Sequence, residues 1–253
     1  MEIPGTTAIV SGAGSGLGAA TARMLATAGA NVALLDRDLA LVEAVAADIG
    51  GRAFACDVAD AVSAEAAVQA ACEAFGSIRI AVNCAGVAPP ARIVGRDGPL
   101  PLAAFADVVA INLTGTFNIL RLAAARMCDL PPLATGERGV IINTASIAAF
   151  EGQIGQAAYA ASKGGVVSLT LPAARELARH GIRVLTIAPG TFATPMLQGL
   201  PADALRHLGE AVPFPSRLGE PVEFAELVMH IIGNVMLNGA VVRLDGALRM
   251  PPK

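Results

Sequence analysis

Short apolar runs alternate with longer alanine-rich stretches along most of the chain. The runs are rich in Val, Ile and Ala and end at Gly, Asp or Asn, which is typical of buried strands. We expect strands at Ala8–Ser11, Val32–Asp36, Arg52–Cys56, Ile80–Asn83, Val140–Thr144, Arg183–Ile187 and Ala240–Leu244. We expect helices at Leu17–Ala28, Asp38–Ile49, Ser63–Phe75, Leu102–Cys128, Ala157–His180 and Val222–Ile232. This alternation predicts an α/β fold, a doubly wound parallel sheet with helices on both faces.

Two long segments that contain Pro and Gly interrupt the alternation, near residues 87–101 and near residues 191–217. Loops of this length in a compact domain usually serve function, so both are predicted to border the substrate. In the second, Met196, Leu197 and Leu200 fit either a mobile apolar lid or the packing of a short helix. No change in composition divides the chain, and residues 1–253 are predicted to form a single domain.

Composition narrows the class of protein. Hydrophobic residues make up 54% of the chain and charged residues 15%, and the formal net charge is −3. This balance does not provide a basic surface, so we expect no nucleic-acid partner. The apolar excess fits a buried parallel sheet and buried subunit interfaces. Polar residues interrupt every long apolar run and the first residues lack a signal-peptide pattern, so we expect no membrane association.

The cysteines and histidines do not form a recognisable site. The spacings between Cys56, Cys72, Cys84 and Cys128 match no zinc or redox motif. We therefore expect reduced thiols and a cytoplasmic location. The three histidines, His180, His207 and His230, have no acidic neighbours at metal-ligand spacing, and we expect no metal site.

A glycine-rich loop follows the first predicted strand. Gly12, Gly16 and Gly18 are spaced Gly-x-x-x-Gly-x-Gly, and Ser15 and Leu17 lie between them at the start of a helix. Glycine permits a tight turn there and lets backbone approach a pyrophosphate, which a helix N-terminus stabilises. The alternative is a glycine-rich turn that binds nothing.

Two carboxylates end the next strands. Asp36 ends the second, where it can accept hydrogen bonds from both hydroxyls of an adenosine ribose and would repel a 2′-phosphate. It therefore favours NAD, although Arg37 leaves a minor role for NADP conceivable, and a helix or turn cap is the alternative role of Asp36. Asp57 and Val58 follow the third strand, where the carboxylate can meet the adenine amino group. Cys84, Ala85 and Gly86 follow the fourth, and their small side chains leave room for a cofactor.

Tyr159, the only tyrosine, precedes Lys163 by one helical turn, so their side chains share a helix face. Moving a hydride from an alcohol carbon requires proton transfer at its oxygen, and a free phenol with a pKa of about 10 is a poor base at neutral pH. A nearby ammonium and a cationic nicotinamide would lower that pKa. Ser146 could hold the substrate oxygen, and Asn112 could hold a water that connects Lys163 to solvent. The alternative is a tyrosine packed at a helix surface beside a solvated lysine.

Together these residues resemble the short-chain dehydrogenase/reductase family over essentially the full length of the chain. The matching pieces are Ser11–Gly18, Asp36, Asp57, Asn83–Gly86, Asn112, Ser146, Tyr159, Lys163 and Pro189-Gly190. The resemblance implies a Rossmann-like fold, a bound NAD and a catalytic tetrad of Asn112, Ser146, Tyr159 and Lys163. Cys84 departs from the family, because a second Asn is common at its position.

Within the family, the sequence resembles the type-2 branch of 3-hydroxyacyl-CoA dehydrogenases, which also oxidises 2-methyl-3-hydroxybutyryl-CoA and some hydroxysteroids. The segments that carry this resemblance are Gly139–Ser146, Ala148–Gln153, Gly155–Tyr159, Val212–Gly219 and Arg243–Met250. This resemblance implies that Gln153 helps Ser146 and Tyr159 to orient the substrate. It also implies that Phe192 and Thr194 line the nicotinamide side and that the enzyme is a homotetramer. The segment Gly86–Pro101 diverges most, which leaves the acyl chain length open.

The reaction expected is interconversion of 3-hydroxyacyl-CoA and 3-ketoacyl-CoA with NAD, with Tyr159 as acid and base. The alternatives are the same chemistry on a hydroxysteroid or another secondary alcohol, and a non-catalytic scaffold or RNA-processing subunit. A serine hydrolase would need His and Asp partners for Ser146, and the sequence suggests none. Arg92, Arg96 and Arg206 could pair with CoA phosphates or remain solvated.

Overall fold

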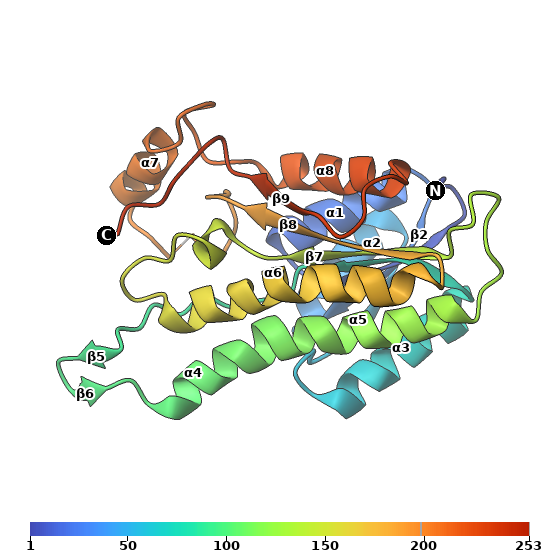
Figure 1. The fold of residues 1–253 in the computed structure, drawn as a ribbon, viewed down its shortest axis with the longest axis horizontal. Coiled ribbons are helices and arrows are strands. Elements are labelled where there is room, and N and C mark those ends of the chain that lie inside the picture. Colours follow the sequence, from blue (N-terminus) through green and yellow to red (C-terminus); the bar gives the residue numbers. More distant parts are fainter. Residues whose placement is uncertain (198, 253) are drawn as a thin grey trace.

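The computed structural model describes residues 1–197 and 199–252 and shows a parallel sheet between two layers of helices (Figure 1). The strands of the seven-stranded sheet are β1 (Thr7–Ser11), β2 (Asn31–Asp36), β3 (Arg52–Ala55), β4 (Ile78–Asn83), β7 (Gly139–Thr144), β8 (Ile182–Pro189) and β9 (Val241–Leu244). Their order is β3-β2-β1-β4-β7-β8-β9 with every pair parallel, which confirms the predicted doubly wound sheet. The chain reverses its direction of winding between β1 and β4, and such reversals leave a crevice at the carboxyl ends of the strands.

Helices cover both faces of the sheet (Figure 1). One layer consists of α1 (Gly16–Thr27), α2 (Leu39–Ile49) and α8 (Pro221–Gly233). The other consists of α3 (Ala61–Phe75), α5 (Gly115–Cys128) and α6 (Ala157–Ala178). At the left of Figure 1, α7 (Ala202–Glu210), the C-terminus and the hairpin of β5 (Val94–Gly95) and β6 (Gly98–Pro99) gather at the same end of the molecule.

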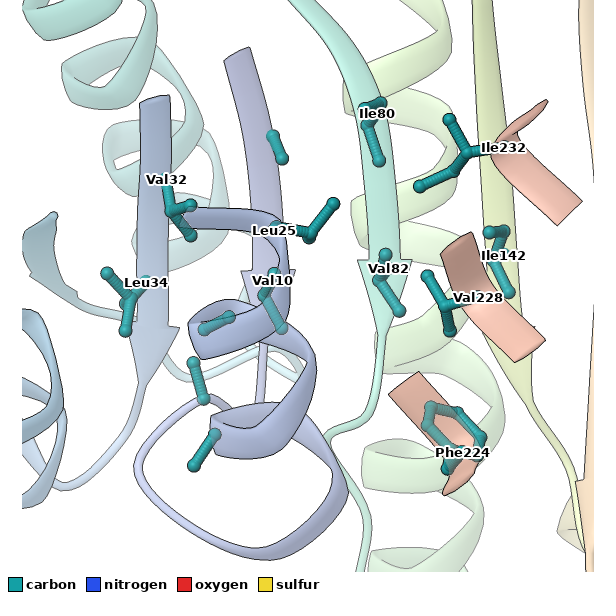
Figure 2. Close-up of a cluster of buried hydrophobic side chains, with 14 of the residues drawn as sticks. Val10, Leu25, Val32, Leu34, Ile80, Val82, Ile142, Phe224, Val228 and Ile232 are labelled. Carbon is teal, nitrogen blue, oxygen red and sulfur yellow. The ribbon is translucent and has the colours of Figure 1, made fainter. Parts of the chain in front are cut away.

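The core follows from the alternation of side chains along each strand. In β4, Ile80 and Val82 pack under α1 and α8, whereas Ala81 packs on the opposite face. Figure 2 shows the first of these clusters, in which Phe224 and Val228 of α8 lie close to the strand side chains. Both faces of each central strand are therefore buried, which is why these runs read as continuously apolar in the sequence.

The structure departs from the predicted elements in the two long segments and in one helix. The helix Leu102–Cys128 is divided into α4 (Leu102–Val109), a π-helical turn η1 (Ala110–Thr114) and α5. With 27 residues and a mean hydropathy of 1.4 in its apolar window, it is long and apolar enough to cross a membrane by composition. In this fold its segments pack against β4, α3 and α6, and 33% of that apolar window is buried. The segments near 87–101 and 191–217 are not pure loops, because they contain the β5–β6 hairpin and α7.

A row of polar side chains crosses the central strands near their carboxyl ends. Ser11 of β1, Asn83 of β4 and Asn143 of β7 are in register with one another. The Ser11 hydroxyl donates to Asn83 Oδ1 at 3.3 Å, and Asn83 Nδ2 donates to Asn143 Oδ1 at 2.9 Å. All three residues are buried, so each hydrogen bond compensates for lost hydration. Among the described residues, Asn143 Nδ2 has no hydrogen-bond partner.

Candidate active site

A cavity of about 1030 Å³ opens at the carboxyl ends of the strands, where the winding reverses. All the predicted cofactor residues line it, namely Gly12, Ser15, Gly16, Leu17, Gly18, Asp36, Asp57, Val58, Cys84, Ala85, Gly86, Pro189, Gly190, Phe192 and Thr194. Ser146, Gln153, Tyr159 and Lys163 line it as well. The fold therefore brings the predicted cofactor residues and, except for Asn112, the predicted catalytic residues to one cavity.

The glycine loop forms a close-packed cradle between β1 and α1. Gly12 has a φ of +66°, and a Cβ there would lie 2.6 Å from the backbone nitrogen of Ala85. A Cβ on Gly18 would overlap the carbonyl oxygen of Gly12. Because Ser15 precedes α1 without a side-chain cap, the first N–H groups of this helix remain available to an anion. The cradle therefore fits the pyrophosphate of a dinucleotide.

Backbone hydrogen bonds fix the Asp36 carboxylate beside this cradle. Its Oδ2 accepts the Gly14 N–H at 2.9 Å and its Oδ1 accepts the Asp38 N–H at 3.1 Å. The helix cap of α2 is Asp38, which accepts the Leu41 N–H, whereas Asp36 caps a turn by accepting the N–H of Asp38 two residues on. A carboxylate has about four acceptor positions, so two bonds leave capacity for ribose hydroxyls.

Asp57 has a turn-forming contact, since its Oδ1 accepts the Ala59 N–H at 2.9 Å. It also borders the cavity together with Val58, on the side away from the catalytic residues of α6. The turn-forming and cofactor roles are therefore compatible.

The proton-transfer residues come from the end of β7 and the start of α6. Lys163 is 4% exposed, and its Nζ donates to the Thr144 carbonyl oxygen at 2.8 Å. The same nitrogen lies 5.9 Å from the centre of the Tyr159 ring. Ser146 Oγ accepts the Ala148 N–H at 3.1 Å at the start of the short helix η2 (Ile147–Ala149). The three side chains thus share the wall of the cavity.

Burial sets the direction of the pKa shift of both Tyr159 and Lys163. Burial raises the pKa of the Tyr159 hydroxyl, and a hydrogen bond with Ser146 opposes that shift only in part. Burial also lowers the pKa of Lys163 to about 8, since desolvation disfavours the ammonium. Burial alone therefore keeps the phenol protonated, and the predicted lowering of its pKa needs the positive charge of a bound nicotinamide in addition to that of Lys163.

Asn112 lies behind the cavity wall rather than on it. Its Oδ1 accepts the Val87 N–H at 2.8 Å, and its Nδ2 donates to the Val87 carbonyl oxygen and to Ser162 Oγ. Both amide hydrogens are therefore in use, and the side chain cannot also donate to the predicted water. Instead it fixes the chain after β4, where a Cβ on Gly86 would lie 3.1 Å from Asn112 Oδ1 and 3.4 Å from Lys163 Nζ.

The far end of the cavity is apolar and includes residues that sequence reasoning missed. From α7, Ala204, Leu208 and His207 line it, and Ala211 follows directly after the helix. The spacing of Ala204, Leu208 and Ala211, with charged residues between them, was the helical signal in the sequence. Arg206 lies on the solvent side of α7, where it pairs with Glu210 at 2.8 Å, which disfavours a phosphate contact.

The remaining predicted residues that line the cavity are Phe192, Thr194 and Gln153. Phe192 is 7% exposed and pairs with Gly219 as an isolated bridge, and Thr194 packs near Gly16. Gln153 Nε2 donates to the carbonyl oxygen of Pro251 at 3.0 Å, so this residue contacts the C-terminal segment. Within residues 1–197 and 199–252, no group of three or more His, Cys, Asp or Glu side chains could hold a metal ion.

Comparison with known proteins identifies the family. A model described as "short chain dehydrogenase" matches residues 6–205. The chain is 51% identical to 3-hydroxyacyl-CoA dehydrogenase type-2 from Bos taurus, over 99% of this chain and 98% of the relative. A crystal structure of 3-hydroxyacyl-CoA dehydrogenase type-2 from Mycobacterium avium has a TM-score of 0.93 at 45% identity and covers 98% of both chains.

A third relative was solved with a bound cofactor. It is a 3-ketoacyl-(acyl-carrier-protein) reductase from Brucella melitensis complexed with NADH, with a TM-score of 0.87 at 30% identity over 98% of this chain and 100% of the other. The family match, the sheet order and the cavity lined by Tyr159 and Lys163 agree with one another. The chain is an oxidoreductase that belongs to the short-chain dehydrogenase family.

Proposed function

We propose that the protein is an NAD-dependent 3-hydroxyacyl-CoA dehydrogenase. The observation that carries this proposal is the lining of the cavity, which joins Ser146 and Tyr159 with the residues of the dinucleotide cradle and with apolar side chains of α7. An acyl chain needs an apolar surface next to the reacting carbon, and the α7 side of the cavity supplies one. The relative from Bos taurus, named for this activity, supports the same substrate class.

The chain's own residues account for the proton-transfer half of the reaction. Ser146 Oγ can donate a hydrogen bond to the substrate oxygen, which holds the hydroxyl toward Tyr159. The Tyr159 oxygen takes the hydroxyl proton in oxidation and returns it in reduction. Lys163, held by the Thr144 carbonyl, stabilises the phenolate while it exists. Bound NAD⁺ supplies the hydride acceptor and a positive charge. The apolar side chains that line the cavity, Leu208 and Leu248 among them, disfavour water next to the reacting carbon.

The substrate is tested by following NADH production with three alcohols. We expect 3-hydroxybutyryl-CoA and its 2-methyl analogue to give a kcat/KM at least about 100-fold above that of a hydroxysteroid, because relatives about 50% identical to this chain are named for 3-hydroxyacyl-CoA. Higher efficiency with the hydroxysteroid would replace the acyl-CoA proposal with the second candidate. Turnover of neither class would contradict both.

For the cofactor we propose NAD rather than NADP, with Asp36 as the determinant. Asp36→Asn retains an oxygen that can accept the Gly14 N–H but removes the charge that repels a 2′-phosphate. We expect the ratio of kcat/KM with NADP⁺ to that with NAD⁺ to rise at least about 100-fold, since two hydrogen bonds to a charged acceptor contribute about 1.5–3 kcal/mol each, or about 3–6 kcal/mol together. The matched control is Arg37→Gln, which removes the neighbouring charge at the same edge of the cavity and should not increase that ratio. A wild-type preference for NADP⁺ would refute the proposal.

A homotetramer and a cytoplasmic location remain predictions. Exposed apolar side chains on α5 and α6, such as Phe117 at 47% and Leu171 at 45% exposure, support contact with further subunits. Seven strands, from β1 near the start of the chain to β9 near its end, form one sheet, which supports a single domain. Light scattering of the purified protein measures the subunit number.

A further inference from the structure

The last residues of the chain form part of the cavity wall. After β9, the segment 246–252 turns back along the loop between η2 and α6, which connects Ser146 to Tyr159. Two hydrogen bonds join the segments. The Ile154 N–H donates to the Pro252 carbonyl oxygen at 3.0 Å, and Gln153 Nε2 donates to the Pro251 carbonyl oxygen. Leu248, Met250 and Pro251 from this segment line the cavity.

A cluster of ion pairs holds this segment at its base. The Arg243 guanidinium donates to both carboxylate oxygens of Glu151, at 2.9 Å and 3.1 Å, and its Nε donates to Asp245 at 2.6 Å. It also lies over the Phe150 ring at 5.2 Å. Arg249 reaches Glu151 at 3.4 Å and Asp245 at 3.2 Å. Two arginines and two carboxylates therefore join β9, the C-terminal segment and the loop after Ser146.

The geometry distinguishes this cluster from an ordinary surface pair. Single exposed ion pairs contribute little, but bidentate pairs within a network are the exception. The Arg243 and Glu151 side chains are only 23% and 25% exposed. The Met250 N–H also donates to Glu151 Oε2 at 3.4 Å, so one carboxylate contacts both the arginine and the segment it holds.

A small apolar cluster lies beside the ion pairs. Leu248 at 4% exposure packs with Ile147 of η2 and Val212 after α7, and Met250 packs against them. Ile147 directly follows Ser146, and Ile147, Leu248 and Met250 also face the cavity. Movement of the C-terminal segment would therefore change the volume next to Ser146 and leave the glycine cradle in place.

We propose that Glu151 and Arg243 are positioning residues that hold the segment 246–252 as a wall of the acyl pocket. They act through Leu248 and Met250, and neither contacts the reacting atoms. The wall sets the affinity for the apolar part of the substrate and contributes nothing to cofactor binding. The identity of the substrate rests on the proposed function, whereas the role of Glu151 and Arg243 in holding the segment 246–252 does not.

The first test measures, without substrate, how firmly the segment 246–252 is held in place. Amide hydrogen exchange of a peptide covering 246–252 and of the Ile154 amide is compared in the wild type, Glu151→Gln and Arg243→Met. We expect exchange to accelerate about tenfold or more in both variants, because each removes the bidentate pair. The matched control Glu65→Gln removes the Arg121–Glu65 pair between α3 and α5 and should leave this exchange unchanged. Unchanged exchange in both cluster variants would overturn the proposal.

The second test separates positioning from general damage. With a short and a long 3-hydroxyacyl-CoA, we expect Glu151→Gln to raise KM for the long substrate about tenfold and to change kcat and the KM for NAD⁺ less than about twofold. Arg243→Lys keeps the charge but cannot donate two parallel hydrogen bonds to Glu151. We expect its KM for the long substrate to lie between those of the wild type and Arg243→Met. Equal effects on both acyl substrates, or an equal rise in the KM for NAD⁺, would contradict a positioning role. A wild-type enzyme inactive on 3-hydroxyacyl-CoA would refute the proposed function and leave the exchange test standing.

Discussion

Tyr159→Phe is expected to lower kcat by about 10³-fold or more while the Kd for NADH changes less than about threefold. The substitution keeps the ring and removes only the oxygen that accepts the proton, and general acid–base catalysis typically contributes about 10²–10⁴-fold. Lys163 keeps its bond to the Thr144 carbonyl, because that contact does not involve the phenol. Turnover is measured at saturating substrate, and the Kd for NADH by its fluorescence.

The matched control for Tyr159→Phe is Ser168→Ala, which removes a hydroxyl from an exposed position on the same helix. It should leave kcat and the Kd for NADH unchanged. If Tyr159→Phe retained turnover within tenfold of the wild type, another group would have to transfer the proton. If NADH affinity fell in parallel with kcat, the tyrosine would act mainly in binding.

The second large effect concerns the cradle. Gly18→Ala is expected to weaken NADH binding about 100-fold or more and to lower the free energy of unfolding by about 1–3 kcal/mol, the usual cost of overpacking. The added Cβ overlaps the Gly12 carbonyl oxygen, which is backbone and cannot rotate away. The loop must therefore move, and its N–H groups lose their alignment with the pyrophosphate.

Gly233→Ala is the control for Gly18→Ala, since this glycine ends α8 and a Cβ there meets nothing within 4 Å. Its stability and NADH affinity should match the wild type. Both variants are compared by thermal unfolding with and without NADH, because a bound ligand raises Tm only if the site is intact. Full NADH stabilisation of Gly18→Ala would show that the cradle is not the binding site.

Local patterns in the sequence predicted the sheet and most of the cavity. The strands are apolar on both faces, so β4 and β7 were recognisable without tertiary information. Gly12 follows β1, Asp36 ends β2 and Tyr159 lies in the first turn of α6. The order of these elements in a doubly wound sheet brings the three residues to the same end of the sheet. The family membership is confirmed, and the position of each site residue on the cavity agrees with the topology except for Asn112.

The features that were missed depend on contacts distant in sequence. The pair Glu151–Arg243 joins residues 92 positions apart, and neither residue carries a local signal of its partner. The pKa directions of Tyr159 and Lys163 depend on burial, which a helical spacing does not reveal. The sequence did not predict the π-helical turn around Asn112, whose side chain forms a hydrogen bond with Val87, 25 residues away.

The polar row of Ser11, Asn83 and Asn143 has a consequence for how the sheet assembles. If β4 slipped by one residue against its neighbours, Asn83 would move to the opposite face, among the aliphatic side chains of α1 and α8. An amide buried there without partners would cost about 1–3 kcal/mol, so misaligned sheets are penalised at their centre. The row thus favours one alignment of the sheet, next to the loops after β1, β4 and β7 that line the cavity.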